Sequence, residues 1–284
     1  MSNQQTLGAV LRGDAQALAA VSGIGFDAAA RAVDRIARHT LGLSPAQRIL
    51  READRASAFD LTGYALALDR VRTGVPIAYV IGEEAFRNHL FRVTPEVLIP
   101  RPDTEVLVDR ALATLPADRP VRVADLGTGS GCVGISIALE RPAASVVCVD
   151  SSPAALAVAR DNAGRLGAGN ARFVESDWYG GLANLRFDLI VSNPPYIAQS
   201  DAHLAQLAHE PRGALVGGAD GLDAIRLIVA EAGAHLQTGG TLLVEHGYDQ
   251  RDAVAALFRV AGFRDVAGYD DLGGRARVMS GHYA

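Results

Sequence analysis

Apolar residues recur at two different spacings along the chain, and the change from one spacing to the other divides it. Up to about residue 85 they fall three and four positions apart, which is the spacing of one face of a helix. Four stretches show this pattern: Ala15–Ala20, Phe26–Arg38, Pro45–Ala53 and Leu61–Thr73. They predict a small helical bundle over residues 1–85.

From residue 105 onward, short unbroken apolar runs alternate with amphipathic stretches. Such runs are typical of strands buried on both faces, and their alternation with helices predicts a doubly wound, mostly parallel sheet. The expected parallel strands are Val121–Leu126, Ser145–Asp150, Ala171–Glu175, Phe187–Ser192 and Gly240–Glu245. A closing antiparallel hairpin is expected at Phe263–Val266 and Arg275–Ser280. The predicted fold class is therefore α/β with a seven-stranded sheet.

A different pattern fills the segment between these two regions. Its apolar positions are broken by Asn88 and Pro95, which favours a β-hairpin. The segment ends in Pro100-Arg101-Pro102-Asp103-Thr104, a rigid entry into a helix that Asp103 or Thr104 can cap.

The predicted organisation is a helical domain at 1–85, a β-hairpin linker at 86–104 and an α/β domain at 105–284. The helical domain carries equal numbers of basic and acidic residues and no nucleophile or metal constellation. Its expected task is therefore recognition of a substrate or support. The chemistry is expected in the α/β domain.

The composition is that of an ordinary soluble globular protein, with 284 residues, 49% hydrophobic and 21% charged. No apolar stretch approaches the ~18 residues that span a bilayer, and no signal peptide is visible, so a cytoplasmic protein without membrane contact is expected. A net charge of −5 argues against a protein that grips long nucleic acid. Cys132 and Cys148 are expected to be reduced and buried, and no metal site is predicted.

A Gly-rich turn follows the first strand of the α/β region, at Gly127-Thr128-Gly129-Ser130-Gly131. Glycines there let the backbone approach a ligand and point N–H groups at it. The dinucleotide-binding pattern Gly-x-Gly-x-x-Gly does not match, because Cys132 occupies the position of its third glycine. The phosphate-binding loop that ends in Gly-Lys-Ser/Thr is also excluded, because the chain has no Lys. The tight form of the loop resembles the cofactor loop of S-adenosylmethionine-dependent methyltransferases.

Two residues at the ends of the next strands fit the same ligand. Asp150 ends the second strand, where a carboxylate can accept both hydroxyls of a ribose. Trp178, the only Trp, follows the third strand and could cover an adenine face. The structural alternatives are that Asp150 only caps the helix beginning at Pro153 and that Trp178 is a core residue.

Asn193-Pro194-Pro195-Tyr196 stands directly behind the fourth predicted strand. The prolines end the ladder and hold the chain rigid, at the sheet edge where ligands bind in α/β folds. The Asn193 side-chain oxygen and the Pro194 carbonyl can each accept one N–H of a planar NH₂ group, with Tyr196 packed on its plane. The structural alternative is a strand end with Tyr196 in the core.

Together these motifs resemble class I methyltransferases that act on planar nitrogen, and in particular the family of bacterial peptide chain release factor glutamine methyltransferases. Further matching segments are Leu98 to Glu105, Gly217 to Leu222, Glu245-His246-Gly247 with Gln250, and Asp271 to Arg275. The family often has Glu where this chain has Asp103. The resemblance covers almost the whole chain, including the helical domain.

The resemblance implies methylation of the glutamine side-chain amide in the Gly-Gly-Gln motif of release factors. It implies that Gly127, Thr128, Gly129, Ser130, Gly131, Asp150, Trp178 and Asn193 bind S-adenosyl-L-methionine. Asn193, Pro194, Pro195 and Tyr196 would hold the glutamine, with Asn193, Pro194 and Tyr196 catalytic, and the helical domain would help dock the release factor. Arg101 is a weaker candidate for the site wall, and core or capping duty is expected for His246.

Three other functions share part of this motif set. A ribosomal protein as the glutamine substrate would need the same catalytic residues. A DNA or RNA adenine methyltransferase would use the same tetrad on a flipped base, but would also need a basic surface. A cofactor-binding sensor would leave the tetrad without a task.

Overall fold

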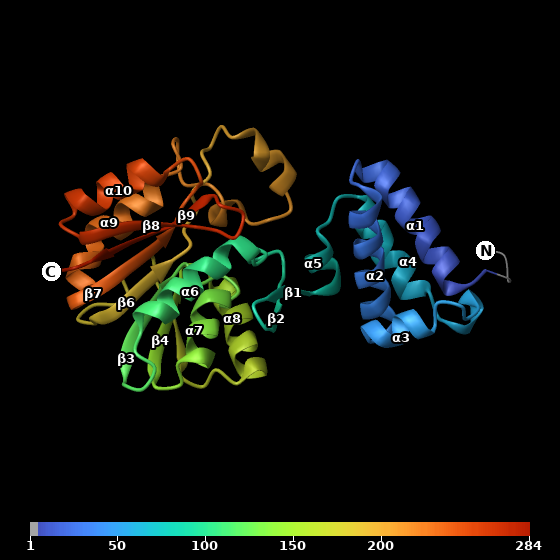
Figure 1. The fold of residues 1–284 in the computed structure, drawn as a ribbon, viewed down its shortest axis with the longest axis horizontal. Coiled ribbons are helices and arrows are strands. Elements are labelled where there is room, and N and C mark those ends of the chain that lie inside the picture. The colour runs from blue at the N-terminus through green and yellow to red at the C-terminus, as the bar shows by residue number, and fades with distance from the viewer. Residues whose placement is uncertain (1–4) are drawn as a thin grey trace. The chain divides into compact units, whose positions relative to one another are not determined.

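The computed structural model describes residues 5–284, and its contacts divide the chain into two compact units at Gly82 and Glu83. The first unit is helical and the second contains both sheets (Figure 1).

The first unit consists of short helices around one apolar cluster. They are α1 (Leu7–Ser22), α2 (Phe26–Leu41), α3 (Pro45–Leu50), α4 (Thr62–Arg72) and α5 (Ile77–Ile81). The predicted helical bundle is confirmed, and α5 was not predicted because five residues are too few to show a periodicity. Ser44 forms a capping box with Gln47 at the start of α3, where the hydroxyl accepts the Gln47 N–H at 3.2 Å.

The second unit begins with an antiparallel hairpin, β1 (Glu83–Phe86) and β2 (His89–Arg92). The predicted hairpin exists, but it starts three residues earlier and ends well before Ile99. Asn162 ties it to the rest of the unit, because its Oδ1 accepts the Arg92 N–H at 2.7 Å and its Nδ2 donates to the Ser130 carbonyl at 2.9 Å. The hairpin is thereby fixed beside the Gly-rich turn.

The main sheet and its helices follow the predicted order. The strands are β3 (Val121–Leu126), β4 (Ala144–Asp150), β5 (Ala171–Glu175), β6 (Phe187–Ser192), β7 (Leu236–Glu245), β8 (Arg264–Asp270) and β9 (Ala276–His282). The helices are α6 (Glu105–Thr114), α7 (Cys132–Glu140), α8 (Pro153–Leu166), α9 (Asp223–His235) and α10 (Arg251–Val260), with 3₁₀ turns η2 (Pro102–Thr104), η3 (Ala202–Leu207) and η4 (Arg212–Ala214). A further 3₁₀ turn, η1 (Ala56–Ala58), belongs to the first unit.

The strand order is β5-β4-β3-β6-β7-β9-β8, parallel up to β7 and antiparallel at β9 and β8. The predicted doubly wound, seven-stranded α/β sheet is confirmed. The order reverses between β3 and β6, which are neighbours although β4 and β5 lie between them in the sequence. A reversal of this kind opens a crevice at the carboxyl ends of the two strands.

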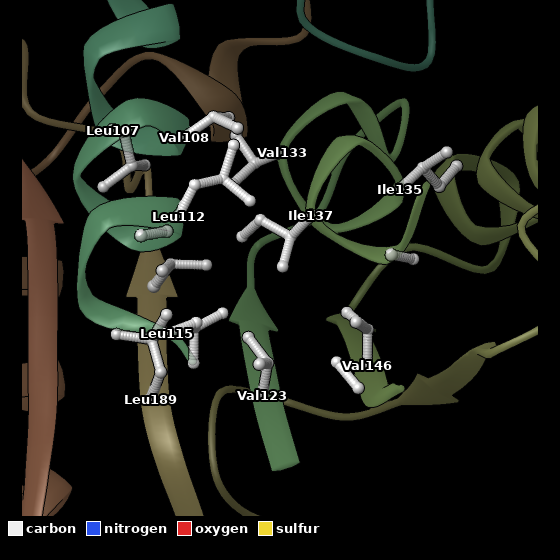
Figure 2. Close-up of a cluster of buried hydrophobic side chains, with 14 of the residues drawn as sticks. Leu107, Val108, Leu112, Leu115, Val123, Val133, Ile135, Ile137, Val146 and Leu189 are labelled. Carbon is white, nitrogen blue, oxygen red and sulfur yellow. The ribbon is translucent and has the colours of Figure 1, made fainter. Parts of the chain in front are cut away.

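Alternate residues of the central strands enter two apolar cores, one on each face of the sheet. Figure 2 shows one of them, where α6 and α7 lay Leu107, Leu112 and Ile137 over Val123 and Leu189. The other core lies beneath α9 and α10 (Figure 1). The sheet is thus buried on both faces, which explains why its strands read as unbroken apolar runs.

One local prediction is wrong, because neither Asp103 nor Thr104 caps α6. Thr104 is the residue before the helix, but its side chain makes no capping hydrogen bond. The Asp103 carboxylate instead accepts a hydrogen bond from Arg277 at 3.1 Å. Both side chains are therefore used elsewhere.

Candidate active site

The loops at the carboxyl ends of β3, β4, β5 and β6 surround a cavity of about 270 Å³. Residues 127–130 after β3, Asp150 at the end of β4, Trp178 after β5 and Asn193 after β6 all line it. Four motifs that are separate in the sequence are therefore brought to one place, at the point where the strand order reverses.

The Gly-rich turn has the backbone that its glycines predict. Gly127, Gly129 and Gly131 have φ angles of 71°, 55° and 83°, a region that favours glycine. A Cβ placed on Gly127 would lie 3.4 Å from the Trp178 ring, so the turn and the ring face each other across a narrow gap. Gly131 leads directly into α7, which follows the turn.

The Asp150 carboxylate bridges the two loops on either side of it. Its Oδ2 accepts the Gly129 N–H and its Oδ1 accepts the Ser152 N–H, each at 2.9 Å. The helix α8 is capped by the Ser152 hydroxyl, so Asp150 does not serve as its cap. Each carboxylate oxygen keeps a further lone pair for a ligand hydroxyl.

Trp178 is half-buried and has a φ of 46°, which is rare for a bulky side chain. It lines the cavity and packs over the Gly-rich turn rather than lying in a closed core. Strained backbone of this kind clusters at ligand sites because the surrounding structure has to hold it.

Asp125 is a wall residue that the sequence reading missed. It is buried, and its Oδ2 accepts the Thr128 hydroxyl at 2.6 Å and the Gly134 N–H at 2.9 Å. Burial raises the pKa of Asp125 to about 6, against the opposing effect of these two hydrogen bonds. A carboxylate inside an otherwise apolar strand was the sequence signal that could have identified it.

A second cavity, of about 380 Å³, lies beside the first. Pro194 and Tyr196 line the second cavity, Pro195 lines the first, and Asn193 lines both. Arg101 also lines both and is paired with the buried Glu210. The tetrad therefore forms part of the partition between two adjoining spaces.

The backbone of the tetrad is held by a Gly-rich segment that packs directly against it. A Cβ on Gly217 would come within 2.4 Å of the Pro195 carbonyl oxygen, and one on Gly221 within 2.2 Å of the Tyr196 carbonyl oxygen. The Gln250 side-chain amide donates to the Tyr196 carbonyl at 3.0 Å. In the described chain, Asn193 Oδ1 and the Pro194 carbonyl accept no hydrogen bond, which leaves both free for a ligand.

Buried charged groups support the Tyr196 side chain from behind. Its hydroxyl donates to Glu245 at 3.1 Å and accepts from Arg277 at 3.5 Å, and Arg277 also contacts Asp271 and Asp103. Burial raises the pKa of Tyr196, so the phenol stays neutral. Of these supporting residues, Glu245 and Asp271 had appeared in the sequence only within the family-like segments, with no role assigned.

The structure also locates His246 and the two cysteines. His246 is fully buried, bonds the Gly247 carbonyl through Nδ1 and lines neither cavity, in agreement with a core role. Cys148 is buried in the core, whereas Cys132 is only partly buried and lines the first cavity. Residues 5–284 contain no cluster of His, Cys, Asp or Glu able to hold a metal ion.

The first cavity has the chemistry to hold S-adenosylmethionine. Asp150 offers lone pairs to a ribose, Gly127 has no side chain that would crowd the Trp178 ring, and the indole offers an apolar face to an adenine. No helix in the part of the chain that the structure describes is long and apolar enough to cross a membrane.

Comparisons with known proteins agree with this geometry. Residues 104–212 match the model of the methyltransferase small domain, and residues 15–82 match the PrmC N-terminal domain. The fold also resembles a solved 16S rRNA N2 G1207 methyltransferase of Thermus thermophilus, with a TM-score of 0.54 and 21% identity over 71% of this chain and 50% of that one. This likeness concerns the fold alone.

Relatives named release factor glutamine methyltransferase are far more similar in sequence. The protein of Bordetella pertussis is 47% identical over 250 residues, which cover 87% of this chain and 92% of that protein. The protein of Escherichia coli K12 is 44% identical over 76% of this chain and 78% of its own length. The chain therefore belongs to the release factor glutamine methyltransferase (PrmC/HemK) family of S-adenosylmethionine-dependent enzymes.

Proposed function

We propose that this protein transfers a methyl group from S-adenosylmethionine to the side-chain amide nitrogen of a glutamine in a peptide chain release factor. The observation that carries the proposal is the position of Asn193, which lines both the cavity at the Gly-rich turn and the cavity beside it. A group held in one space can thus meet a group held in the other. The family of the chain supplies the identity of the substrate.

The residues that would hold the cofactor surround the first cavity. Gly127 to Gly131, including Thr128 and Ser130, would present a backbone with small side chains that the cofactor can approach closely, Asp150 would accept the ribose hydroxyls, and Trp178 would cover the adenine. Asn193 would complete the wall. When bound, S-adenosylmethionine supplies a methyl group activated by a positively charged sulfur.

The tetrad would hold the glutamine amide in the second cavity. An amide nitrogen is a poor nucleophile because its lone pair is delocalised into the carbonyl. Asn193 Oδ1 and the Pro194 carbonyl would each accept one of its N–H bonds, which aims the nitrogen and stabilises positive charge that develops on it. Tyr196 would form part of the wall of the second cavity, with Pro195 on the side of the first. The nitrogen would gain the methyl group as the bond from that carbon to the sulfur breaks, and it would release one proton to water.

The proposed partner is a release factor whose Gly-Gly-Gln loop reaches this site. The two glycines before the glutamine add no side chain that would have to enter with it. We propose that the helical unit contributes to docking, since it carries the family's own N-terminal domain and lacks chemistry-bearing clusters in its described residues.

The test is transfer of a labelled methyl group from S-adenosylmethionine to purified release factor, followed by peptide mass mapping. The expected result is one methyl group on the Gly-Gly-Gln glutamine, and none when that glutamine is replaced by Ala. A ribosomal protein and duplex DNA serve as competing acceptors under the same conditions. Labelling of either one instead of the release factor would overturn the proposed substrate.

A further inference from the structure

Thr104 is buried at the start of α6, yet its hydroxyl does no capping. It lies instead against the tetrad, where Thr104 Oγ1 accepts a hydrogen bond from Asn193 Nδ2 at 3.2 Å. The side-chain amide of Asn193 therefore presents its nitrogen to Thr104. Its oxygen is left for the site.

Glu245 lies behind both residues, at the end of β7, and its side chain is almost fully buried. Its Oε1 accepts the Tyr196 hydroxyl at 3.1 Å, whereas its Oε2 is buried and accepts no hydrogen bond of ordinary geometry among the described residues. The Thr104 hydroxyl is close enough to lower the pKa of the Glu245 carboxyl, and so favours its ionised form. Glu245 lines neither cavity, so it acts on a ligand only through its neighbours.

The directions of these hydrogen bonds follow from the carboxylate. An ionised carboxylate only accepts, so both hydroxyls that face it have to donate. A Thr104 hydroxyl that donates to Glu245 has only lone pairs left for Asn193. Asn193 then has to offer Thr104 its NH₂ group, and its Oδ1 is turned the other way.

We propose that Glu245 and Thr104 are positioning residues that hold the Asn193 amide with its oxygen toward the substrate amide. With the opposite orientation, Asn193 would present an NH₂ group to the substrate NH₂ group, and two donors would face each other. This inference rests on the proposed function, because it assigns a cause to the acceptor role of Asn193.

The charge state of Glu245 links this arrangement to pH. Burial raises the pKa of Glu245 to about 7, opposed by hydrogen bonds from Thr104 and Tyr196 and by Arg277, and the Asp103 charge adds to the increase. The other charged or titratable groups around it are Cys132, Asp271, which pairs with Arg277, and His246, its neighbour in sequence. Below pH 7 the protonated carboxyl becomes a donor, and the direction of the hydrogen bonds is no longer enforced.

The decisive experiment compares Thr104→Val with Thr104→Ser. Valine keeps the shape of threonine without the hydroxyl, whereas serine keeps the hydroxyl and leaves a small void. We expect kcat for methyl transfer to fall about tenfold or more in T104V, and T104S to exceed T104V severalfold, a loss in line with that of one catalytic hydrogen bond. A packing role predicts the reverse order, with T104V the faster variant.

Glu245→Gln supplies a second readout. The Gln side chain has the volume of Glu, but its NH₂ group is a hydrogen-bond donor. Of the Thr104 and Tyr196 hydroxyls, the one that faces this NH₂ group can no longer donate to residue 245. We expect kcat to fall at pH 8 with the Kd for S-adenosylmethionine within about threefold of the wild type. The wild-type kcat should decline as the pH falls through about 7, and this decline should be absent from E245Q.

The outcomes separate this inference from the proposed function. If the wild-type enzyme labels no release factor, the proposed function is wrong. If the wild type is active but T104V matches or exceeds T104S, the positioning role is wrong and the function stands. An unchanged decline below pH 7 in E245Q would also overturn the role of Glu245, and thermal melts of each variant show that it is folded.

Discussion

The two compact units bury different kinds of residues. In the described part of the helical unit, every residue in the core is apolar or a tyrosine, from Leu7 to Ile81. In the second unit the buried set also includes Asp125, Glu210, Glu245 and Arg277. Burying a charged group costs free energy unless partners offset it. The second unit therefore carries a cost that the first avoids, and it carries it around the two cavities. Asp125 lines the first cavity, Glu210 pairs with Arg101, and Glu245 and Arg277 contact Tyr196.

The charges of the helical unit are arranged differently. The Asp34 carboxylate accepts a hydrogen bond from Arg38 Nε at 2.8 Å and one from Arg48 Nε at 2.7 Å. All three side chains remain partly exposed to water. Exposed pairs of this kind contribute little stability. The comparison teaches that burial of charge, rather than the presence of charge, separates the unit that contains the candidate site from the helical unit.

The largest loss of activity is expected when the side chain of Asn193, which lines both cavities, is removed. We expect Asn193→Ala to lower kcat about 10³-fold, about 4 kcal/mol, because one acceptor at the developing charge is lost. The midpoint of thermal unfolding should change little, since Asn193 is only half-buried. The measurement is methyl transfer at saturating substrate beside a thermal melt. Near wild-type turnover would refute the acceptor role of Asn193.

The cost of buried charge can be measured at Glu245. Its pKa is raised on folding to about 7 from an ordinary value of 4.5, so the folded state holds its proton more tightly than the unfolded state. Stability from this group is therefore complete below pH 4.5 and is lost as the pH rises to 7, by about 3 kcal/mol. Glutamine has no such loss, so Glu245→Gln should be more stable than the wild type at pH 8.

The measurement is the free energy of unfolding of both proteins between pH 4.5 and 8. The difference between them should grow with pH and level off above 7. Asp125 is also buried with a raised pKa, but it is present in both proteins and cancels. A difference that is independent of pH would mean that the buried carboxyl imposes no such cost. If E245Q is more stable than the wild type and also has a lower kcat, the buried carboxylate costs stability while it orients the Asn193 amide.

Much of the second unit was predictable because its strands are buried on both faces. Unbroken apolar runs located β3 and β6 at their observed bounds, and the motifs behind them followed from the rule that ligands bind at strand ends. The helical unit was predicted from its apolar spacing. Its short α5 has no such pattern, and the hairpin β1–β2 begins before the segment in which it was expected.

The supporting residues could not be predicted in the same way. Thr104 and Asn193 are 89 positions apart, and Thr104 looked like a helix cap because local sequence shows only local partners. Arg277 stands in the last strand and contacts Tyr196 and Asp103 only after the sheet has formed. The proposed ligand contacts were thus recognisable from local motifs, whereas the sequence assigned no role to Glu245, Asp271 or Arg277 and a different one to Thr104.

A smaller effect is expected at Asp150. Both of its oxygens accept backbone N–H groups, so the NH₂ group of an Asn would face a donor and loosen the Gly-rich turn. We expect Asp150→Asn to weaken S-adenosylmethionine binding about tenfold, about 1.4 kcal/mol. Isothermal titration calorimetry of the wild type and the variant measures the two Kd values.

Asp188→Asn is the matched control for this variant. Asp188 also accepts a backbone N–H, from Arg122 at 2.8 Å, but it lies at the start of β6 and lines neither cavity. Its replacement should leave the Kd for S-adenosylmethionine unchanged. If both variants weaken S-adenosylmethionine binding equally, then loss of any hydrogen bond from a backbone N–H to a carboxylate disturbs the site. That result would refute a specific role of Asp150 in binding the cofactor.

The smallest expected effect compares one serine from each unit. Ser44 caps α3 and Ser152 caps α8, each by accepting a backbone N–H at 3.2 Å, but only Ser152 lines the first cavity. Replacement of either by Ala should lower the free energy of unfolding by about 1 kcal/mol, the usual value of a cap. Only Ser152→Ala should also weaken S-adenosylmethionine binding, by a fewfold at most, because its loop adjoins Asp150. Weaker binding in Ser44→Ala would break the comparison, since a change confined to the helical unit would then reach the cofactor.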